Sequence, residues 1–496
     1  MGEAQEWLFE PEFNRSIKVS AMDERITSNA GFLLLREADE KLGLIKRIAE
    51  QMHDPRDPDK IRYGLTELLR ERVYSLAQGY SAQDDLDRLA HDPALRMAVW
   101  DRPGAQVLDE RLASQPTQSR LIDTLASIPQ NLEILRESLS DPVIMHLHSG
   151  RQGERPVRRA TVDVDSFPAE IHGKQAGGAH NGYYKQTIYH PLVASFAVKG
   201  DYDSSRLGNG FLHAILRKGT VHTGEGIIRF LKNTLEKSRK LGLMVDFRLD
   251  AGLLMGRATD FLTRRRCRFI GRIKSNPVLE RLAEPYLKRS PGRPPKGGTE
   301  VAIELGQYQA ESWQCGQRLI LVIVDKPDPK TGQLALFPRH FFLVMNWTKQ
   351  ELPADDAVQH YRARGTFEDR LGEFNQAVKP RFSSPHFREN EVALLLGLLA
   401  FNLVSMLRCE MEQQAGHGCD LQRFQQTVLT AGARVVKGSR RLTMYIAQSA
   451  ASLWTVMAQC ISRWKVTASW SLPAKPVSSE WMPAPAHAFL HEVLTI

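Results

Sequence analysis

The apolar positions of the first 150 or so residues recur at helical spacing. In the runs 33–45 and 65–76 they fall on one face of a helix, which is the pattern of amphipathic helices. Short breaks such as HDPRDPDK (53–60) separate these runs. The pattern predicts a helical N-terminal domain over 1–155. Two interpretations of it stay open: a purely structural helical bundle, or DNA binding by helices and basic loops.

From about residue 156 the pattern changes to strands that alternate with helices. Strands are predicted at 160–167, 187–198, 243–252 and 268–274, and helices at 226–241 and about 253–265. This order predicts a mixed α/β core over 156–275. The segment 276–350 then combines a Pro/Gly-rich basic loop with strands at 318–326 and 339–347, which indicates a β-rich insertion.

The last third of the chain returns to helices. One long helix is predicted over 354–378 and a strongly apolar one over 391–411, so 351–411 is assigned to the last part of the core. The run 392–407 contains Asn402 and is shorter than a membrane-spanning helix needs, so we expect a buried core helix and no membrane partner. The remainder, 412–496, is predicted to be a C-terminal helical region with a Pro/Ser-rich loop.

Composition and charge narrow the function classes. The chain has 496 residues, of which 42% are hydrophobic and 25% charged, enough for several soluble domains. Its net charge of +9 favours a polyanionic partner, most often nucleic acid. The five cysteines include no CxxC pair, which argues against a zinc ribbon and against a disulfide framework. The N-terminus has no signal-peptide pattern, so a cytoplasmic location is expected.

Two carboxylates share one face of the first predicted strand. Asp163 and Asp165 lie two residues apart in TVDVDSF, and side chains two apart on a strand point the same way. Like charges this close repel unless a cation or a proton lies between them. Asp250 follows at the end of a later strand, a usual place for a functional carboxylate in an α/β sheet. The alternatives are a solvated edge strand for the pair and a helix cap or turn for Asp250.

A third carboxylate lies on the predicted helix 354–378. Tyr361, Arg364 and Glu368 are spaced i, i+3 and i+7, which places them on one stripe of that helix. Arg364 could hold the Glu368 carboxylate or a phosphate, or the two residues could form a surface ion pair. Three carboxylates from distant segments can hold two divalent ions that clamp a phosphodiester, and hard oxygen ligands suit Mg²⁺ or Mn²⁺.

Several longer motifs resemble one known family, the DDE transposases of bacterial insertion sequences, and in particular the group named thirteen-eighty. The resemblance runs over most of the chain, and its most specific part is the spaced Tyr-Arg-Glu signature. The segments that carry it include NAGFLLLRE (29–37), TVDVDSFPAEIHGKQAGGAHNGYYKQTIYHPL (161–192), RLDAG (248–252), FIGRIKSNP (269–277), YRARGTFEDRL (361–371) and FRENEVALLLGLLAFNL (387–403).

The resemblance implies an RNase H-like catalytic core and cut-and-paste transposition at terminal inverted repeats. The implied catalytic and metal-binding triad is Asp165, Asp250 and Glu368, with Mg²⁺ as cofactor and Mn²⁺ as a substitute. The first carboxylate stays open between Asp163 and Asp165; the following Ser166 favours Asp165 and leaves Asp163 as a same-face helper at the metal. The implied partners are double-stranded DNA and a second copy of the chain in the synaptic complex, in the bacterial nucleoid.

Basic residues gain a meaning from the resemblance. Tyr361 and Arg364 are expected to contact the DNA backbone. Further DNA contacts are predicted for TRRRCR (263–268), for GRPPK (292–296) and near the acidic helix; the residues are Arg264, Arg265, Arg266, Arg293 and Lys379. Arg272 and Lys274 continue the first of these segments. Trp313 and Trp347 could stack on an extruded base, although buried tryptophans in a β module are the more ordinary interpretation.

The sequence departs from the family at two positions after Glu368. Gly372 and Asn375 stand where lysines are usual, so a phosphate contact is lost or moved to Lys379 or Arg381. Three alternatives therefore stay open: a transposase relative that binds DNA without cutting, a related RNase H-like nuclease, and a DNA-binding regulator that uses only the N-terminal helices.

Overall fold

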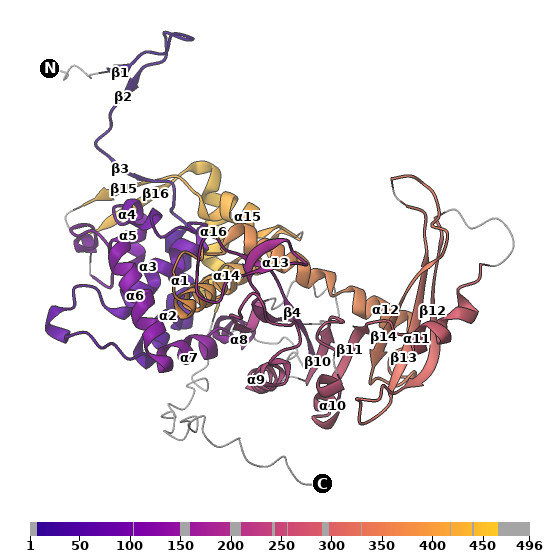
Figure 1. The fold of residues 1–496 in the computed structure, drawn as a ribbon. Helices are drawn as coiled ribbons and strands as arrows, with labels where there is room; N and C mark the ends of the chain where they lie inside the picture. Colours follow the sequence, from indigo (N-terminus) through magenta and orange to yellow (C-terminus); the bar gives the residue numbers. More distant parts are fainter. Residues whose placement is uncertain are drawn as a thin grey trace, which may run out of the picture.

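The computed structural model of the protein is a mixed α/β fold with one large sheet and a helical body (Figure 1). It describes residues 7–102, 104–148, 159–198, 210–240, 244–254, 256–289, 297–328, 330–416, 418–438 and 441–464. Arg293 and the rest of GRPPK lie outside the described residues, as does the Pro/Ser-rich loop near the C-terminus.

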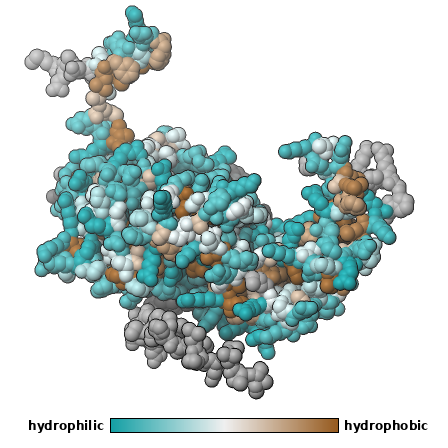
Figure 2. All heavy atoms as spheres, in the orientation of Figure 1, coloured by the Kyte–Doolittle hydropathy of each residue, from teal (hydrophilic) through white to brown (hydrophobic). Residues whose placement is uncertain are grey.

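The N-terminal part is helical, as its periodicity predicted. Its α-helices are α1 (Phe32–Leu42), α2 (Leu44–Gln51), α3 (Leu65–Ala77), α4 (Asp85–Leu89), α5 (Pro93–Val99), α6 (Gln115–Ser127), α7 (Pro129–Ser138) and α8 (Asp141–His148). Before them, a short hairpin of β1 (Trp7–Phe9) and β2 (Val19–Ser20) projects from the body (Figure 1). It carries exposed apolar side chains, among them Trp7 and Phe9 (Figure 2).

The apolar helix α14 (Phe387–Ala415) is the centre of this body. It packs against α3, α6 and α8, and its leucines share one core with apolar side chains of these helices. By length and composition alone α14 could cross a membrane, but 89% of its most apolar window is buried inside the protein. Asn402 is buried too, and its amide donates to the carbonyl oxygens of Leu139 (2.8 Å) and Phe211 (2.9 Å). The helix therefore joins the helical body to the sheet, as a buried core helix does.

The large sheet has eight strands in the order β12-β13-β14-β11-β10-β4-β8-β9. Their bounds are β4 (Arg159–Ser166), β8 (Leu192–Val198), β9 (Gly210–Ile215), β10 (Met244–Leu249), β11 (Arg268–Ile273), β12 (Thr299–Tyr308), β13 (Gln317–Asp325) and β14 (Arg339–Met345). The central strands β4, β10 and β11 are parallel, and the flanking pairs are antiparallel. The strands of the β-rich segment thus continue the core sheet through β14, while the domain boundaries stay predictions.

Helices cover both faces of the sheet. On one face α9 (Ile227–Lys240) and α10 (Gly256–Arg264) pack on residues such as Val162 and Val164 of β4. On the other face α12 (Ala354–Arg362) packs on β11, β13 and β14, and α13 (Gly365–Ala377) packs near β8 and β9. Because side chains alternate along a strand, Asp163 and Asp165 belong to the face that α12 and α13 cover.

Two predicted elements are interrupted. The strand predicted over 187–198 is two strands, β7 (Gln186–Tyr189) and β8, because Pro191 between them has no N–H to donate to a ladder. The helix predicted over 354–378 is α12 and α13. At the junction the Arg364 N–H bonds to the Tyr361 carbonyl at 3.0 Å, a tighter i−3 turn, and the weak helix former Gly365 follows.

The C-terminal region predicted to be helical, 412–496, also contains strands. After α15 (Leu421–Phe424) and a π-helical turn (Gln425–Leu429), the chain forms β15 (Ala433–Lys437) and β16 (Leu442–Ile446) before α16 (Gln448–Ser462). These strands build a sheet with β3 (Arg25–Thr27), about 400 residues earlier in the sequence. The periodicity of a short segment gives no information about which distant strand that segment pairs with.

Candidate active site

Two of the three predicted catalytic carboxylates stand side by side at the edge of the central sheet. The parallel strands β4 and β10 are in register with Asp163 opposite Arg248 and Val164 opposite Leu249. The next pair of positions is Asp165 and Asp250, so their side chains leave the same face of neighbouring strands, which lie about 5 Å apart. The chain turns directly afterwards: the Asp250 carbonyl accepts from the N–H groups of Leu253 and Leu254, both at 3.0 Å.

Glu368 reaches this edge from α13 through Arg364. The Arg364 guanidinium donates from Nη1 to Glu368 Oε1 at 2.7 Å and from Nη2 to Asp165 Oδ2 in a short ion pair. The Arg364 and Asp165 side chains are largely buried, whereas Glu368 is 64% exposed. Direct contacts therefore join Asp165, Arg364 and Glu368. Asp250 is near enough for its charge to influence the pKa of Asp165 and of Arg364.

Burial dominates the electrostatics of Asp165. Burial is the largest cause of a pKa that is raised overall from 3.8 to about 6; Arg364 acts to lower this pKa, and the nearby charges of Asp250 and Glu368 act to raise it. A backbone N–H also supports the charged form, since Ser166 N donates to Asp165 Oδ1 at 2.7 Å. A carboxylate whose pKa stays raised despite a bound guanidinium lies where additional positive charge is favoured.

Asp163 has a different environment from the one the sequence suggested. Its side chain is fully buried, and both of its oxygens accept from Arg248, at 2.7 Å from Nε and 2.7 Å from Nη2. This geometry disfavours the predicted role of Asp163 beside a metal, because its side chain is enclosed and each of its oxygens already accepts a hydrogen bond from Arg248. The assignment of Asp165 as the first triad carboxylate stays a prediction.

The Asp163–Arg248 pair ties together the elements that carry the triad. Arg248 Nη1 donates to the His360 carbonyl of α12 at 2.9 Å, four residues before Arg364. On the adjoining strand, Ser195 Oγ accepts from the buried Arg370 of α13, two residues after Glu368. Two sets of buried polar contacts thus link strands of the sheet to the helices: one joins β4 and β10 to α12, and the other joins β8 to α13. These are the elements that carry the three carboxylates.

Tyr361 lies on α12, near Asp165 and Asp250. Burial raises the pKa of Tyr361 to about 12, with contributions from Asp250 and Asp165 that Arg364 and Arg272 oppose. The hydroxyl is therefore a neutral donor over the whole physiological range. Arg272 lies on β11 one position past Gly271, which pairs with Leu249 of β10, so this exposed cation is at the same sheet edge as Asp250.

The donor set at this edge suits a hard divalent cation. In the part of the chain that the structure describes, no three His, Cys, Asp or Glu side chains already surround a common point. The Arg364 guanidinium instead provides the positive charge between Asp165 and Glu368. Carboxylate oxygens that share one cation are the ligands Mg²⁺ and Mn²⁺ prefer, so the residues fit such ions once the arginine side chain withdraws.

The basic segment 263–268 lies away from the acidic residues. Arg264 is the last residue of α10, and Arg265 and Arg266 follow it before the first residue of β11, whereas Asp250 follows the last residue of the parallel strand β10. A strand of six residues is about 20 Å long, so these arginines lie near the opposite end of the sheet from the acids. Arg264 is bound to Gln314, and the Arg265 guanidinium lies over the Phe261 ring.

Lys379 lies beyond the C-terminal end of α13. Burial lowers the pKa of this lysine, and the nearby Glu170 opposes that effect. It is eleven residues from Glu368, about three helical turns, so it does not share the immediate surroundings of the triad. Gly372 is one turn after Glu368, and a side chain added there would meet no atom within 4 Å.

Two site residues were missed by the sequence analysis. Arg217, which follows β9, is buried and donates to the carbonyls of His190 (2.9 Å), Thr223 (2.8 Å) and Glu225 (3.1 Å); burial lowers its pKa to about 10, which Glu225 and Asp165 oppose. Tyr184 also lies near the acids: burial raises its pKa, and Asp165 and Asp250 contribute. The only signal was the pair of tyrosines in NGYYK (181–185), which has no periodic pattern.

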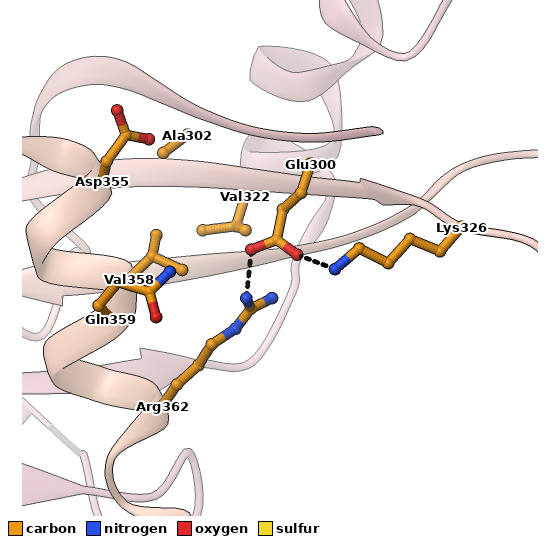
Figure 3. Close-up of a pocket in the computed structure, with 8 residues that line it drawn as sticks. All are labelled: Glu300, Ala302, Val322, Lys326, Asp355, Val358, Gln359 and Arg362. Atoms are coloured by element: carbon orange, nitrogen blue, oxygen red, sulfur yellow. Dashed lines mark hydrogen bonds and ion pairs between the residues drawn. The ribbon is translucent and has the colours of Figure 1, made fainter. Parts of the chain in front are cut away.

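A separate pocket of about 370 Å³ lies between β12, β13 and α12 (Figure 3). Glu300 crosses it and pairs with both Arg362 and Lys326 (Figure 3). These charges satisfy one another, so the contact fastens the long strand β12 to the helix that leads to Arg364 rather than forming a second catalytic centre.

The chain matches one family model and is similar to solved structures. A family model described as transposase DDE domain, group 1, matches residues 9–465, most of the chain. Among curated proteins none matches. A cryo-EM structure of a piggyBac transposase synaptic complex with hairpin DNA is similar with a TM-score of 0.41 and 12% sequence identity, over 80% of this chain and 78% of that chain. That likeness is too weak to transfer any residue or ligand.

Proposed function

The chain belongs to the transposase family with a group 1 DDE domain, and from this premise we propose that it is a metal-dependent DNA transposase that cleaves phosphodiester bonds and transfers the cut strand. The observation that carries the proposal is the meeting of Asp165, Asp250 and Glu368 around one buried cationic group. Carboxylates gathered at the ends of neighbouring strands can bind divalent cations, and such cations can bridge the carboxylates to the phosphates of a polyanion. The basic character of the protein favours the binding of that polyanion.

Each residue has a proposed task. Asp165, Asp250 and Glu368 would hold Mg²⁺, or Mn²⁺ in its place. When bound, the two ions would supply the charge that activates the attacking oxygen and stabilises the leaving oxygen at phosphorus. Arg364 would leave Asp165 and bind a DNA phosphate, for which its planar fork is suited. The neutral Tyr361 hydroxyl would donate to a backbone oxygen, and Arg272 would neutralise a neighbouring phosphate.

The finer features of the function come from the resemblance of the sequence motifs. We propose membership of the thirteen-eighty group, an RNase H-like core and cut-and-paste action at terminal inverted repeats. The DNA partner is the duplex at the two element ends. Since both ends have to be cut together, we also propose a homodimer as the active complex. The location that fits this activity is the cytoplasm, at the nucleoid.

The test is strand cleavage of a supercoiled plasmid that carries the DNA flanking the coding region. With Mg²⁺, the wild-type protein should nick this plasmid, and Asp250→Ala should lower the rate at least about 100-fold, since even outer-shell changes at metal sites cost 10–100-fold. Asp356→Ala, an exposed carboxylate on α12, is the matched control and should behave as wild type. Equal nicking by wild type and Asp250→Ala would remove the catalytic assignment. Binding without any nicking would favour a DNA-binding relative.

A further inference from the structure

A small hairpin presents an exposed tyrosine beside the acidic site. Strands β6 (Ala179–Asn181) and β7 form a three-stranded sheet with β5 (Ala169–Glu170), which follows Asp165 by only a few residues. The hairpin tip is Gly182, Tyr183, Tyr184 and Lys185. Tyr183 is 86% exposed, more than any other large hydrophobic side chain among the described residues.

The tip is held in one shape by its own backbone contacts. Asn181 Oδ1 accepts from the N–H groups of Tyr183 (3.0 Å) and Tyr184 (3.3 Å), and the Lys185 N–H bonds to the Asn181 carbonyl at 2.8 Å. Asn181 Nδ2 in turn donates to the Gly219 carbonyl at 3.3 Å. Lys185 has a positive φ of 56°, which closes the turn and leaves its ammonium exposed. The ring of Tyr183 is therefore presented by a pre-formed turn.

A short chain of contacts places the tip at the acids. The Tyr183 and Tyr184 rings meet edge to face, 4.9 Å between centroids, and Tyr184 meets His190 in the same manner at 6.1 Å. His190 is two residues before Leu192, which pairs with Ser166, the neighbour of Asp165. Tyr184 also interacts electrostatically with both Asp165 and Asp250. Tyr183 is thus the outermost ring of an aromatic pair whose inner ring adjoins the triad.

We propose that Tyr183 is a stacking platform for an unpaired nucleobase at the DNA end that the acidic site holds, with Lys185 on the adjacent phosphate. The inference rests on the proposed function. An exposed ring next to a cation, at a site for a polyanionic strand, is how proteins bind single-stranded nucleic acid without reading its sequence. The two tryptophans suggested by the sequence do not offer this surface, because Trp313 and Trp347 are both buried and packed against Tyr308 and His360.

The experiment compares the binding of two DNA probes in the presence of Ca²⁺. This ion can bridge the carboxylates and the DNA phosphates without supporting rapid cleavage. One probe is a blunt duplex. The other is the same duplex with a single-stranded 3′ extension that has 2-aminopurine at the first unpaired position. Wild type should prefer the extended probe and quench its emission. Tyr183→Ala should weaken extended-probe binding about fivefold or more, the lower end of what one base–aromatic stack contributes, and leave blunt-duplex binding unchanged.

Two further variants make the result specific. Tyr183→Trp should retain the preference and the quenching, because indole stacks on bases as well as phenol does. Tyr445→Ala, which removes a 54% exposed tyrosine from β16 in another sheet, should leave both unchanged. The proposal is overturned if wild type binds the two probes equally, or if Tyr183→Ala keeps the preference. If stacking is present but Mg²⁺-dependent nicking is absent, the proposed function fails and the stacking site stands as a DNA-end contact.

Discussion

Asp163 and Asp165 lie on one face of one strand, yet their arginine partners and their exposure to solvent differ. Asp163 is fully buried and meets a single guanidinium that satisfies both of its oxygens at equal distances. Asp165 is at the strand end, where Arg364 divides its charge between this carboxylate and the exposed Glu368. The guanidinium of Arg248 donates to both oxygens of Asp163. At Asp165 the guanidinium of Arg364 does not offset the cost of burying the carboxylate, so the pKa of Asp165 is raised to about 6.

The comparison teaches how one strand can provide both rigidity and reactivity. The Asp163 end is closed by hydrogen bonds from β10 to the backbone of α12, so it fixes where the helices stand. At the Asp165 end the carboxylates of Asp165 and Glu368 share one guanidinium, and we expect a rotation of the Arg364 side chain to release them.

Removing Arg248 should have the largest effect on stability. Arg248→Met leaves the Asp163 carboxylate buried without a partner, which costs about 3–5 kcal/mol for a broken buried pair. Urea denaturation should show this loss in the free energy of unfolding. The double variant Asp163→Asn with Arg248→Met should recover much of it, because the unpaired charge of Asp163 is then removed. If Arg248→Met alone unfolds at the wild-type midpoint, the Asp163 end does not hold the site together.

The Asp165 carboxyl should make stability depend on pH in the opposite sense from an ordinary ion-paired aspartate. Its folded pKa of about 6 lies above the ordinary 3.8, so its contribution is fully present below about pH 4 and is lost as pH rises through 6. The difference corresponds to about 3 kcal/mol. Measured in EDTA, Asp165→Asn should therefore gain stability over wild type between about pH 4 and 7.

The control for this pH dependence is Asp123→Asn, which replaces an exposed carboxylate on α6. Its free energy of unfolding should follow that of wild type at every pH. A difference between Asp165→Asn and wild type that is the same at both ends of the pH range would contradict the raised pKa of Asp165.

The position of Arg364 between two carboxylates predicts competition with metal. Arg364→Gln removes the competing charge and should tighten Mn²⁺ binding about fivefold, the equivalent of a partly exposed ion pair of about 1 kcal/mol. Electron paramagnetic resonance of free Mn²⁺ gives this affinity without any need for activity. Arg362→Gln, which breaks the contact to Glu300 instead, is the matched control. Weaker Mn²⁺ binding by Arg364→Gln would mean that the arginine supports the ion site.

The smallest effect is expected at Gly372. A lysine there extends from the face of Glu368, one turn later, into open space. Gly372→Lys should increase the salt dependence of DNA binding by about one phosphate contact and stabilise α13 by less than about 1 kcal/mol. Binding titrations at several salt concentrations measure the slope. Gly416→Lys, at the end of α14 with a positive φ, is the control that should leave the slope unchanged.

The sequence by itself determined the element order and the chemical types at the site. Periodicity located α9, β10, β11, β13, β14 and α14 to within a few residues, because each buries a regular apolar face. The pattern made Asp163, Asp165, Asp250 and Glu368 candidates, since carboxylates on strands and on a charged helix face stand out from an apolar background. The choice of Asp165, Asp250 and Glu368 as a triad came from the resemblance to a known family. The pairing of β15 and β16 with β3 was invisible, because strands so distant in sequence leave no local pattern.

Only the tertiary structure decided which charges oppose one another. The alternation of side chains along the strand placed Asp163 and Asp165 on the same face. It did not show that Arg248, in register on the neighbouring strand, pairs with Asp163, or that Arg364 pairs with Asp165. Parallel pairing likewise separated Arg264 from Asp250, although they are close in sequence, because α10 returns the chain to the other end of the sheet. Spacing along a chain fixes which side chains share a face, whereas partners depend on strand register and helix packing.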